Sequence, residues 1–296
     1  RLGCSPVFCV VTDTDINRVW APLRPAESRI TYFAPSDRVV RRLRAYGVPE
    51  DRVIMTGFPL PGELLGGPDL PVLKANLAQR LVRLDPERTF ARRAGPAIER
   101  ALGPLPEQFR GRPPLVTFAV GGAGAQTELV RKFLPGLRDS IRSRRLRLAL
   151  VAGVRSEVAR RFHAWISELE LDDVRGDGIR ILYEPDPPKY FRAFNALLAE
   201  TDVLWSKPSE IAFFGALGIP LVISRPVGRH ERYNRRWAIE YGAGLRQRKT
   251  RHAGEWLLEW RADGARAASA WAGFTSLPKD GLYRIVDRVR NASTSS

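Results

Sequence analysis

The sequence predicts an α/β protein whose strands form parallel sheets. In the segment from Thr201 to Asn234, a buried strand (Val203 to Trp205), a polar loop, an apolar helix (Ile211 to Leu217) and a second buried strand (Leu221 to Ser224) follow one another closely. The same alternation of strand and helix runs through the chain from residue 115 onward. Short connections between alternating strands and helices are typical of a parallel sheet, whose ligand crevice lies outside the carboxyl ends of its strands.

The first segment, residues 1–61, reads as three strands and one helix. The strands are VFCVV, which begins at Val7 and ends in an acidic loop, then ITYFAP and DRVIMTGFP. Ser36 as N-cap and Gly47 as C-terminal stop bound a helix over SDRVVRRLRAYG. Three strands are few for a domain, and the chain opens at Arg1 without a methionine. We therefore expect this segment to be the C-terminal part of a larger N-terminal domain.

Residues 62–113 are rich in Pro, Gly and Arg and contain two amphipathic stretches, near Leu73 to Leu84 and Ala94 to Leu102. In the first stretch the leucines at 73, 77, 81 and 84 mark one helical face. We expect this segment to be a helical connection between two domains, packed on both neighbours.

Residues 114–290 are predicted to form a complete Rossmann-like domain. Its five expected strands are LVTFAV, RLALVAG, IRILYEP, DVLW and PLVIS, with helices between them. One helix carries an apolar stripe made of Phe191, Phe194, Leu197 and Leu198. The small polar residues 291–296 are expected to form a frayed tail.

Composition excludes several classes of protein. The chain has 296 residues, of which 44% are hydrophobic, and no apolar run approaches the ~20 residues of a membrane-spanning helix. Two cysteines, Cys4 and Cys9, are too few for a disulfide framework. The three histidines lie far apart in sequence, so the sequence predicts no metal site.

The net charge of +16 favours anionic partners, namely phosphate-bearing ligands, acidic membrane surfaces or nucleic acid. The arginines are spread along the chain, however, and no nucleic-acid-binding motif accompanies them, which disfavours nucleic acid.

A glycine-rich loop, GGAGA, joins the strand at 115–120 to the next helix. Gly121, Gly122 and Gly124 would let the backbone approach an anion, and the N–H groups of the following helix would point at it. The alternative is a tight strand-to-helix turn without a ligand. The spacing is not G-x-G-x-x-G, so the ordinary dinucleotide fingerprint is absent.

Two polar loops follow the strands at 203–205 and 221–224. In the first, Glu210 is placed to accept hydrogen bonds from ribose hydroxyls, and Lys207 and Ser209 could meet a phosphate or hydroxyl. Alternatively, Glu210 only caps the next helix and Lys207 is a solubilising surface residue. The second loop offers groups for a sugar or phosphate, or is simply a polar surface loop: Arg229, His230, Glu231 and Asn234.

Asp13 and Asp15 end the first strand of the chain and are candidate general bases. Capping of the next segment explains them equally well. The chain has no Gly-x-Ser-x-Gly elbow, P-loop or paired-cysteine redox motif, so hydrolase and kinase functions lack their usual parts.

These motifs together resemble the GT-B glycosyltransferases. The resemblance rests on the run from Val203 to Asn234, the glycine loop at 121–124 and YEPDPP at 183–188. Among the branches of that superfamily, the pattern is most similar to the one containing the MurG-type N-acetylglucosaminyltransferases and the monogalactosyldiacylglycerol synthases. Residues 34–61 resemble the end of that family's N-terminal domain, with its Gly-x-Pro exit at Gly57 and Pro59.

The resemblance implies a fold and a chemistry. Two Rossmann-like domains would face each other, with a UDP- or similarly activated sugar on the C-terminal domain and the acceptor on the N-terminal one. No metal would be needed, because the helix dipole and backbone donors stabilise the leaving diphosphate. Carried over by motif, the donor contacts would be Gly121, Gly122 and Gly124 for the diphosphate, Glu210 for the ribose, and His230 and Glu231 for the sugar, with Asn234 at the family spacing. Asp13 matches the loop lining the acceptor side.

The sequence also departs from the family pattern. Lys207 and Pro208 stand where the family has small residues, and the family's N-terminal glycine-rich loop has no counterpart. The leading hypothesis is an inverting glycosyltransferase that needs no cofactor beyond its nucleotide-sugar co-substrate. We expect it in the cytoplasm and, from its charge, at the inner face of the cell membrane, with anionic lipids or other phosphate-bearing molecules as acceptors. The alternatives are a nucleotide-sugar epimerase of similar shape and a non-catalytic nucleotide-sugar-binding protein.

Overall fold

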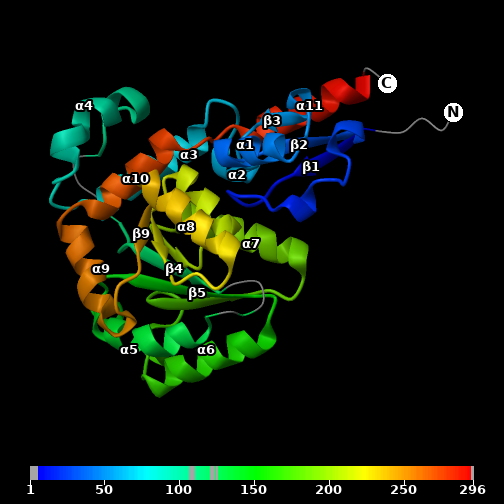
Figure 1. Cartoon of the computed structure of the whole chain (residues 1–296). Helices are drawn as coiled ribbons and strands as arrows, with labels where there is room; N and C mark the ends of the chain where they lie inside the picture. The colour runs from blue at the N-terminus through cyan, green and yellow to red at the C-terminus, as the bar shows by residue number, and fades with distance from the viewer. Residues whose placement is uncertain (1–5, 107–110, 121–123, 125, 295–296) are drawn as a thin grey trace.

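The computed structural model describes residues 6–106, 111–120, 124 and 126–294. Within these residues the strands form two parallel sheets, one with the order β1-β2-β3 and one with the order β6-β5-β4-β7-β8-β9. Helices cover the larger sheet on both faces (Figure 1). The predicted α/β class with two Rossmann-like parallel sheets is confirmed.

The smaller sheet comprises β1 (Val7–Val10), β2 (Ile30–Ala34) and β3 (Val53–Met55), with α1 (Asp37–Ala45) crossing between β2 and β3. Ser36 caps α1 as predicted, because its hydroxyl accepts a hydrogen bond from the backbone N–H of Val39 at 3.3 Å. The chain turns after α1 at Gly47, whose φ of +90° suits glycine. This sheet has its own small core, which is separate from that of the larger sheet.

The larger sheet places its central strands where the strand order reverses. Its strands are β4 (Leu115–Ala119), β5 (Arg147–Gly153), β6 (Ile179–Tyr183), β7 (Val203–Ser206), β8 (Leu221–Ile223) and β9 (Gly244–Arg246). Its crossover helices are α5 (Glu128–Arg142), α6 (Ser156–Glu168), α7 (Pro187–Glu200), the 3₁₀ helix η5 (Glu210–Leu217) and α8 (Arg229–Glu240). Chain order moves outward from β4 to β6, then returns to β7 on the other side of β4, which is the switch point at which such folds bind ligands.

The sequence-based prediction missed β9 and the nature of η5. Strand β9 has only three residues, GLR, too few to show a strand pattern. The predicted apolar helix after β7 is a 3₁₀ helix that is buried from Ala212 to Leu217, because it packs between α8 and α10 (Ala265–Ser276). In α7 the predicted apolar stripe is buried at Phe194, Leu197 and Leu198, whereas Phe191 is exposed.

The segment at 62–113 forms α2 (Gly62–Leu65), α3 (Pro71–Leu84) and α4 (Ala91–Leu102). The four leucines of the predicted α3 face are all buried and belong to the core of the larger sheet. Helix α3 packs against α10, so this part of the connection is joined firmly to the second domain.

The C-terminal helices return the chain to the smaller sheet. After α9 (Ala253–Ala262) and α10, helix α11 (Gly281–Thr294) lies beside β3, where the guanidinium of Arg284 donates to the carbonyl oxygen of Met55 at 3.4 Å (Figure 1). Helix α11 continues through residues 291–294, where the sequence predicted a frayed tail. Short 3₁₀ turns complete the fold: Arg18–Trp20, Pro25–Glu27, Glu50–Arg52, Asp172–Val174 and Thr250–His252.

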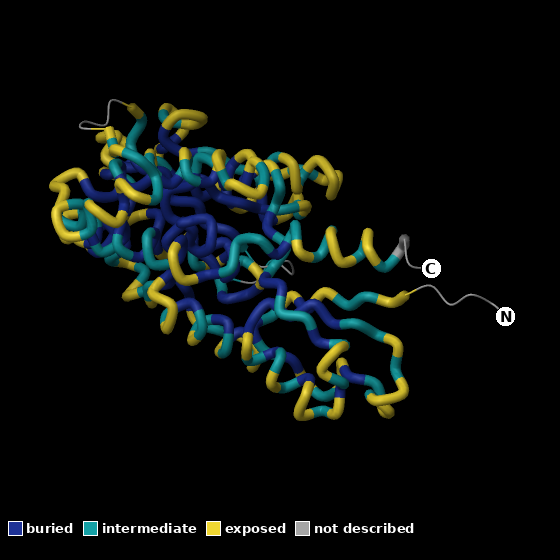
Figure 2. The backbone as a smooth tube through the Cα atoms, turned by 90° about the horizontal axis from the view of Figure 1, so that it is seen from above, coloured by how far each residue is buried: buried dark blue, intermediate teal, exposed yellow. Residues whose placement is uncertain are grey.

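Buried backbone concentrates around the larger sheet, whereas the smaller sheet has a thinner buried layer (Figure 2). The strand-end loops of the larger sheet are therefore attached to the best-buried part of the molecule.

Candidate functional site

Three polar loops stand side by side at the carboxyl edge of the larger sheet. Strands β4, β7 and β8 are neighbours, and the residues at their ends pair in register: Ala119 with Ser206, and Ser206 with Ile223. The hydroxyl of Ser206 donates to the carbonyl oxygen of Ala119 at 2.8 Å, which fixes the first two loops to one another. The sheet thus brings together the strand ends from which the glycine loop, the Ser-Lys-Pro-Ser loop and the loop before α8 continue in sequence.

The glycine loop leads directly into helix α5. Gly121 and Gly122 lie outside the described residues. Gly124 has a φ of +71°, and its carbonyl oxygen accepts a hydrogen bond from the hydroxyl of Thr127 at 2.7 Å. A turn of this kind in front of a helix N-terminus suits a phosphate, because free N–H groups and the helix dipole point toward it.

No pattern in the sequence singles out Gln126 as a site residue. It has a φ of +69°, and its amide nitrogen donates to the carbonyl oxygen of Arg225 at 2.7 Å. Its amide oxygen accepts a hydrogen bond from the hydroxyl of Ser224. Gln126 therefore ties the glycine loop to the loop that follows β8, two strands away.

Glu210 begins η5 and is exposed. Among the described residues its carboxylate has no hydrogen-bond or ion-pair partner. Its negative charge adds to the effect of burial on Tyr190 of α7, and together they raise the pKa of that phenol to about 12. A free carboxylate at this edge of the sheet is available to accept hydrogen bonds from hydroxyl groups of a ligand.

Lys207 and Glu231 hold each other across the two loops. Their ammonium and carboxylate groups lie 2.6 Å apart, and only 18% and 3% of the two side chains are exposed. The carboxylate also accepts a hydrogen bond from the backbone N–H of Val227 at 2.7 Å. Burial raises the pKa of Glu231, but Lys207 and the backbone N–H groups of Val227 and Gly228 outweigh it and hold that pKa below its ordinary value. Both residues, predicted as ligand contacts, are engaged with each other.

Replacing Lys207 with methionine should lower the free energy of unfolding by about 1–2 kcal/mol at neutral pH, because the buried Glu231 carboxylate loses its charged partner. A carboxyl whose pKa is lowered in the folded state stabilises it above the unfolded pKa and loses that contribution as pH falls. The difference between wild type and variant should therefore be constant above about pH 6 and shrink below the ordinary value of 4.5.

Urea unfolding of both proteins from pH 3 to pH 8 measures this difference. Lys189→Met, at an exposed position of α7, is the matched control and should show little change at any pH. A difference for Lys207→Met that stays constant down to pH 3 would contradict the assigned ion pair.

Asn234 is fully buried and joins the two halves of the molecule. Its amide oxygen accepts hydrogen bonds from the backbone N–H and the hydroxyl of Thr14, at 2.9 and 2.7 Å. Its amide nitrogen donates to the carboxylate of Asp13 at 2.8 Å and to the carbonyl oxygen of Pro208 at 3.1 Å. The side chain predicted to touch the donor thus connects α8 with the loop after β1.

The two aspartates of the first loop differ in their surroundings. Asp15 is ion-paired with Arg38 at 3.0 Å and Arg42 at 3.2 Å, and 11% of its side chain is exposed. Asp13 is half-buried and is held on one side by Asn234. Of the two predicted bases, Asp13 is the one that has no cationic partner among the described residues.

A cavity of about 470 Å³ lies between the loop after β1 and the N-terminus of α8. Exposed Arg229 and His230 line it from α8, and the ring of Tyr233 lies under the guanidinium of Arg38 at 4.1 Å. Ser209 does not line this cavity; it is buried in the turn before η5. From the first half of the chain the lining includes Cys9, Val10, Val11, Thr12, Asp13, Asp15, Ile16, Asn17, Trp20 and Arg42. The cavity has the size of a small-molecule site and draws on both halves.

Comparison with known proteins supports the fold. A protein-family model described as "Domain of unknown function (DUF6938)" matches residues 162–265, and no curated protein matches the chain. A Listeria monocytogenes protein proposed to be a UDP-N-acetylglucosamine 2-epimerase superposes with a TM-score of 0.54 at 13% identity. The chain has a GT-B-like fold.

The superposition covers 90% of this chain and 60% of the Listeria protein, so the chain spans well under two thirds of that relative. A glycosyltransferase from Rickettsia africae gives a TM-score of 0.48 at 11% identity, covering 98% of this chain and 71% of that one. MurG from Acinetobacter baumannii gives 0.44 at 13% identity, covering 88% and 91%.

Two further observations concern the described residues alone. Within them, no group of three or more His, Cys, Asp or Glu side chains is arranged to hold a metal ion. Nor does any helix there combine the length and the apolar character that crossing a bilayer requires.

Proposed function

We propose that this chain binds a nucleotide sugar at the carboxyl edge of its larger sheet and belongs to a glycosyltransferase. The observation that carries the proposal is the arrangement of that edge. A helix N-terminus behind Gly124 and the carboxylate of Glu210, which has no partner among the described residues, follow neighbouring strands at the switch point of a GT-B-like fold. A cavity lined by Arg229 and His230 lies at the N-terminus of α8, which follows the next strand. Each group matches one part of a nucleotide sugar.

The diphosphate would lie at the N-terminus of α5 beside Gly124, where the helix dipole stabilises its negative charge. Glu210 would accept hydrogen bonds from the two ribose hydroxyls. Arg229 and His230 would face the sugar or the phosphate, since both are exposed on the first turn of α8. The ion pair between Lys207 and Glu231 would hold the loop after β7 against the start of α8.

The acceptor would enter from the smaller sheet. Asp13 and His230 both line the cavity, and the Asp13 carboxylate would take the proton of the acceptor hydroxyl as that oxygen attacks the anomeric carbon. Direct displacement of the nucleoside diphosphate from the far side inverts the anomeric centre. Asp15 would position the loop through Arg38 and Arg42. Backbone donors in place of a metal would stabilise the leaving group, so we expect turnover to resist EDTA.

Replacing Glu210 with alanine should weaken nucleotide binding by about 1–3 kcal/mol, because charged hydrogen bonds to the ribose are lost. Calorimetric titration with UDP, GDP and dTDP and their sugars measures the effect and identifies the base. Glu255→Ala, an exposed carboxylate in the first turn of α9, removes the same group away from the site and should leave affinity unchanged. Equal affinities of the Glu210 variant and wild type would remove Glu210 from the site.

A nucleotide-sugar epimerase is the second candidate, and the Listeria protein with the TM-score of 0.54 is the observation that favours it. Asp13 and His230 in one cavity would then act as the acid and base pair on the sugar. Incubation with a nucleotide sugar and no acceptor separates the two functions. An isomerised donor would support the epimerase, whereas an intact or slowly hydrolysed donor supports the transferase.

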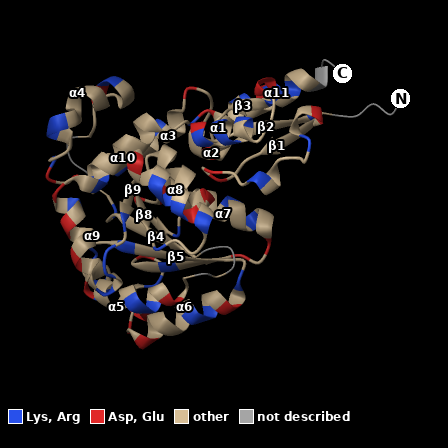
Figure 3. Cartoon of the chain, viewed as in Figure 1, with Lys and Arg blue, Asp and Glu red and all other residues tan. Residues whose placement is uncertain are grey.

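An anionic lipid acceptor, a cytoplasmic location and contact with the inner face of the membrane are further parts of the proposal and rest on the charge of +16. Cationic side chains are spread over many elements (Figure 3). Co-sedimentation with anionic vesicles at low salt, and its loss with neutral vesicles, would support membrane contact.

A further inference from the structure

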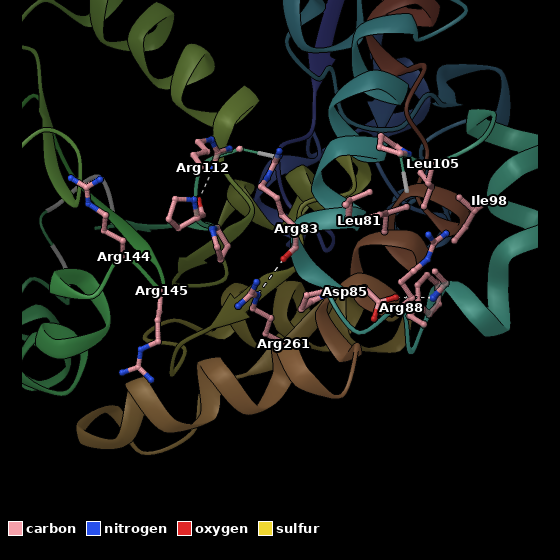
Figure 4. Close-up of a pocket in the computed structure, with 18 residues that line it drawn as sticks. Leu81, Arg83, Asp85, Arg88, Ile98, Leu105, Arg112, Arg144, Arg145 and Arg261 are labelled. Carbon is pink, nitrogen blue, oxygen red and sulfur yellow. Dashed lines mark hydrogen bonds between the residues drawn. The ribbon is translucent and has the colours of Figure 1, made fainter. Parts of the chain in front are cut away.

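A second cavity, of about 630 Å³, lies at the opposite, amino edge of the larger sheet (Figure 4). Its lining includes Pro113 and Pro114, directly before β4, and Arg144 and Arg145, directly before β5. The strand-end loops of the proposed donor site lie at the other edge of the sheet, after the carboxyl ends of β4, β7 and β8. The two cavities are therefore separated by the length of the sheet and share no lining residue.

Arginine dominates the lining of this amino-edge cavity. Six arginines line it, against a single carboxylate, Asp85, among the described lining residues. Two of the arginines share one buried carboxylate behind the wall: Asp202 accepts hydrogen bonds from Arg83 at 2.7 Å and Arg112 at 2.8 Å. The six are Arg83, Arg88, Arg112, Arg144, Arg145 and Arg261. Positive charge thus exceeds negative charge around the cavity.

Two more cations are buried behind the same wall. Burial lowers the pKa of Arg80 to about 10 and that of Arg266 to about 9, and Asp202 offsets only part of the effect. The side-chain Nε of Arg266 has no hydrogen-bond partner in the described part of the chain. These buried cations add to the positive charge on this side of the sheet, although neither of them lines the cavity.

The cavity is not uniformly polar. Figure 4 shows Arg144 and Arg145 toward one end, and Leu81, Ile98 and Leu105 together toward the other. Arg83 and Arg112 lie between these ends. Phe90 adds an aromatic ring to the lining. Arg88 and Asp85 also lie toward the second end in Figure 4, so the cavity has one cationic end and one end where apolar side chains gather beside a cation and a carboxylate. Such a cavity fits a ligand with a phosphate and an apolar group, and its volume is that of a small-molecule site.

We propose that the amino-edge cavity is a binding site for a small phosphate-bearing amphipath. Its phosphate contacts the arginines near the starts of β4 and β5, and its apolar group lies against the partly exposed Leu105, beside the buried Leu81 and Ile98. Guanidinium groups suit this role because they bind phosphate oxygens in pairs. The apolar group is either an alkyl chain, as in a lipid, or a base, as in a nucleotide. The site is separate from the proposed donor site and does not depend on it.

The test measures binding by calorimetry, using octyl phosphate below its micellar concentration, adenosine 5′-monophosphate, inorganic phosphate and octanol. The key variant is Arg144→Asn with Arg145→Gln. Both side chains are exposed, and asparagine tolerates the φ of +54° at position 144, so the fold should survive. The control, Arg131→Gln with Lys132→Gln, removes two adjacent exposed cations from α5 that do not line the cavity.

We expect one of the two amphipaths to bind wild type at least about tenfold more tightly than inorganic phosphate or octanol. Tighter binding of octyl phosphate indicates a lipid-like ligand, and tighter binding of adenosine monophosphate indicates a nucleotide. The double arginine variant should bind that ligand about tenfold or more weakly. The control pair and Glu210→Ala should bind it like wild type. UDP affinity should be the same in the double arginine variant and wild type, so failure here is distinct from failure at the donor site.

Three outcomes would overturn the proposal. The first is that neither amphipath binds wild type. The second is that inorganic phosphate binds as tightly as both amphipaths, so that the apolar group contributes nothing to affinity. The third is that the control pair loses as much affinity as the double arginine variant, so that binding depends only on the overall positive charge.

Discussion

Replacing Asp202 with alanine is expected to lower the free energy of unfolding by about 3–5 kcal/mol, because it leaves buried cations without their carboxylate. The Asp202 side chain is fully buried, and its oxygens accept hydrogen bonds from Arg83, from Arg112 and from the backbone N–H of Leu115, the last at 2.8 Å. Arg80, completely buried nearby, would lose the opposite charge that partly offsets its burial.

The Asp202 cluster joins three parts of the fold. Arg83 belongs to α3, Arg112 to the segment before β4, and Asp202 directly precedes β7. Arg80 adds hydrogen bonds to the carbonyl oxygens of Thr201 and Leu217, at 2.8 and 3.0 Å. Removing the carboxylate should therefore weaken the contact of α3 with the sheet. It should also weaken the contact between Asp202 and the start of β4.

Urea unfolding monitored by tryptophan fluorescence measures this loss. Asp173→Ala is the matched control, since Asp173 pairs with Arg142 on the surface with 58% of its side chain exposed, and it should cost less than about 0.5 kcal/mol. Similar losses for the two aspartates would show that the Asp202 cluster does not stabilise the fold in the way described.

Replacing Asn234 with alanine is the second large effect that we expect, at about 2–4 kcal/mol of folding stability. The change removes four hydrogen bonds and leaves buried partners unsatisfied, including the hydroxyl and backbone N–H of Thr14. It should also release the Asp13 carboxylate from its hydrogen bond to α8. The wall of the cavity between the two halves, which Asp13 lines, would then be less firmly held. Nucleotide affinity should then fall less than turnover, since the donor contacts of Glu210 and α5 remain.

The control for this variant is Asn195→Ala, which removes one exposed hydrogen bond of 2.7 Å to Glu63. It should alter stability by less than about 0.5 kcal/mol and leave turnover unchanged. If Asn234→Ala were no more harmful than Asn195→Ala in both measurements, the described connection between α8 and the first loop would be wrong.

Local patterns in the sequence were enough to predict most of the architecture. The α3 leucines recur at helical spacing and are all buried, and Ser36 caps α1 as its position before a helical pattern indicates. Strand β9 escaped prediction because three residues cannot show a period. Phe191 fits the apolar stripe of α7 by spacing, but its side chain is exposed in the structure. The pattern of one helix does not show how far the neighbouring elements extend over it.

The site was harder to predict, because residue type does not reveal partners. Glu231 and Asn234 have the groups that a sugar needs, yet the fold uses them internally, the first with Lys207 and the second with Thr14. Glu210 has the same chemistry but remains free among the described residues. The chain separation of 220 residues between Thr14 and Asn234 shows why only the folded structure could distinguish these cases.

The remaining features depend on long-range geometry. Gln126 matters because of a positive φ and a contact with the loop after β8, neither of which leaves a sequence signal. The amino-edge cavity gathers arginines from α3, from the start of β4 and from the end of α5, so no tract of charge appears in the sequence.

A crystal structure of the protein with UDP would show whether the carboxyl edge of the larger sheet binds a nucleotide sugar. We expect the diphosphate at the N-terminus of α5 beside Gly124 and the ribose hydroxyls on the carboxylate of Glu210. UDP bound elsewhere, for instance among the arginines of the amino edge, or no bound UDP at saturating concentration, would rule out a nucleotide-sugar site at this edge.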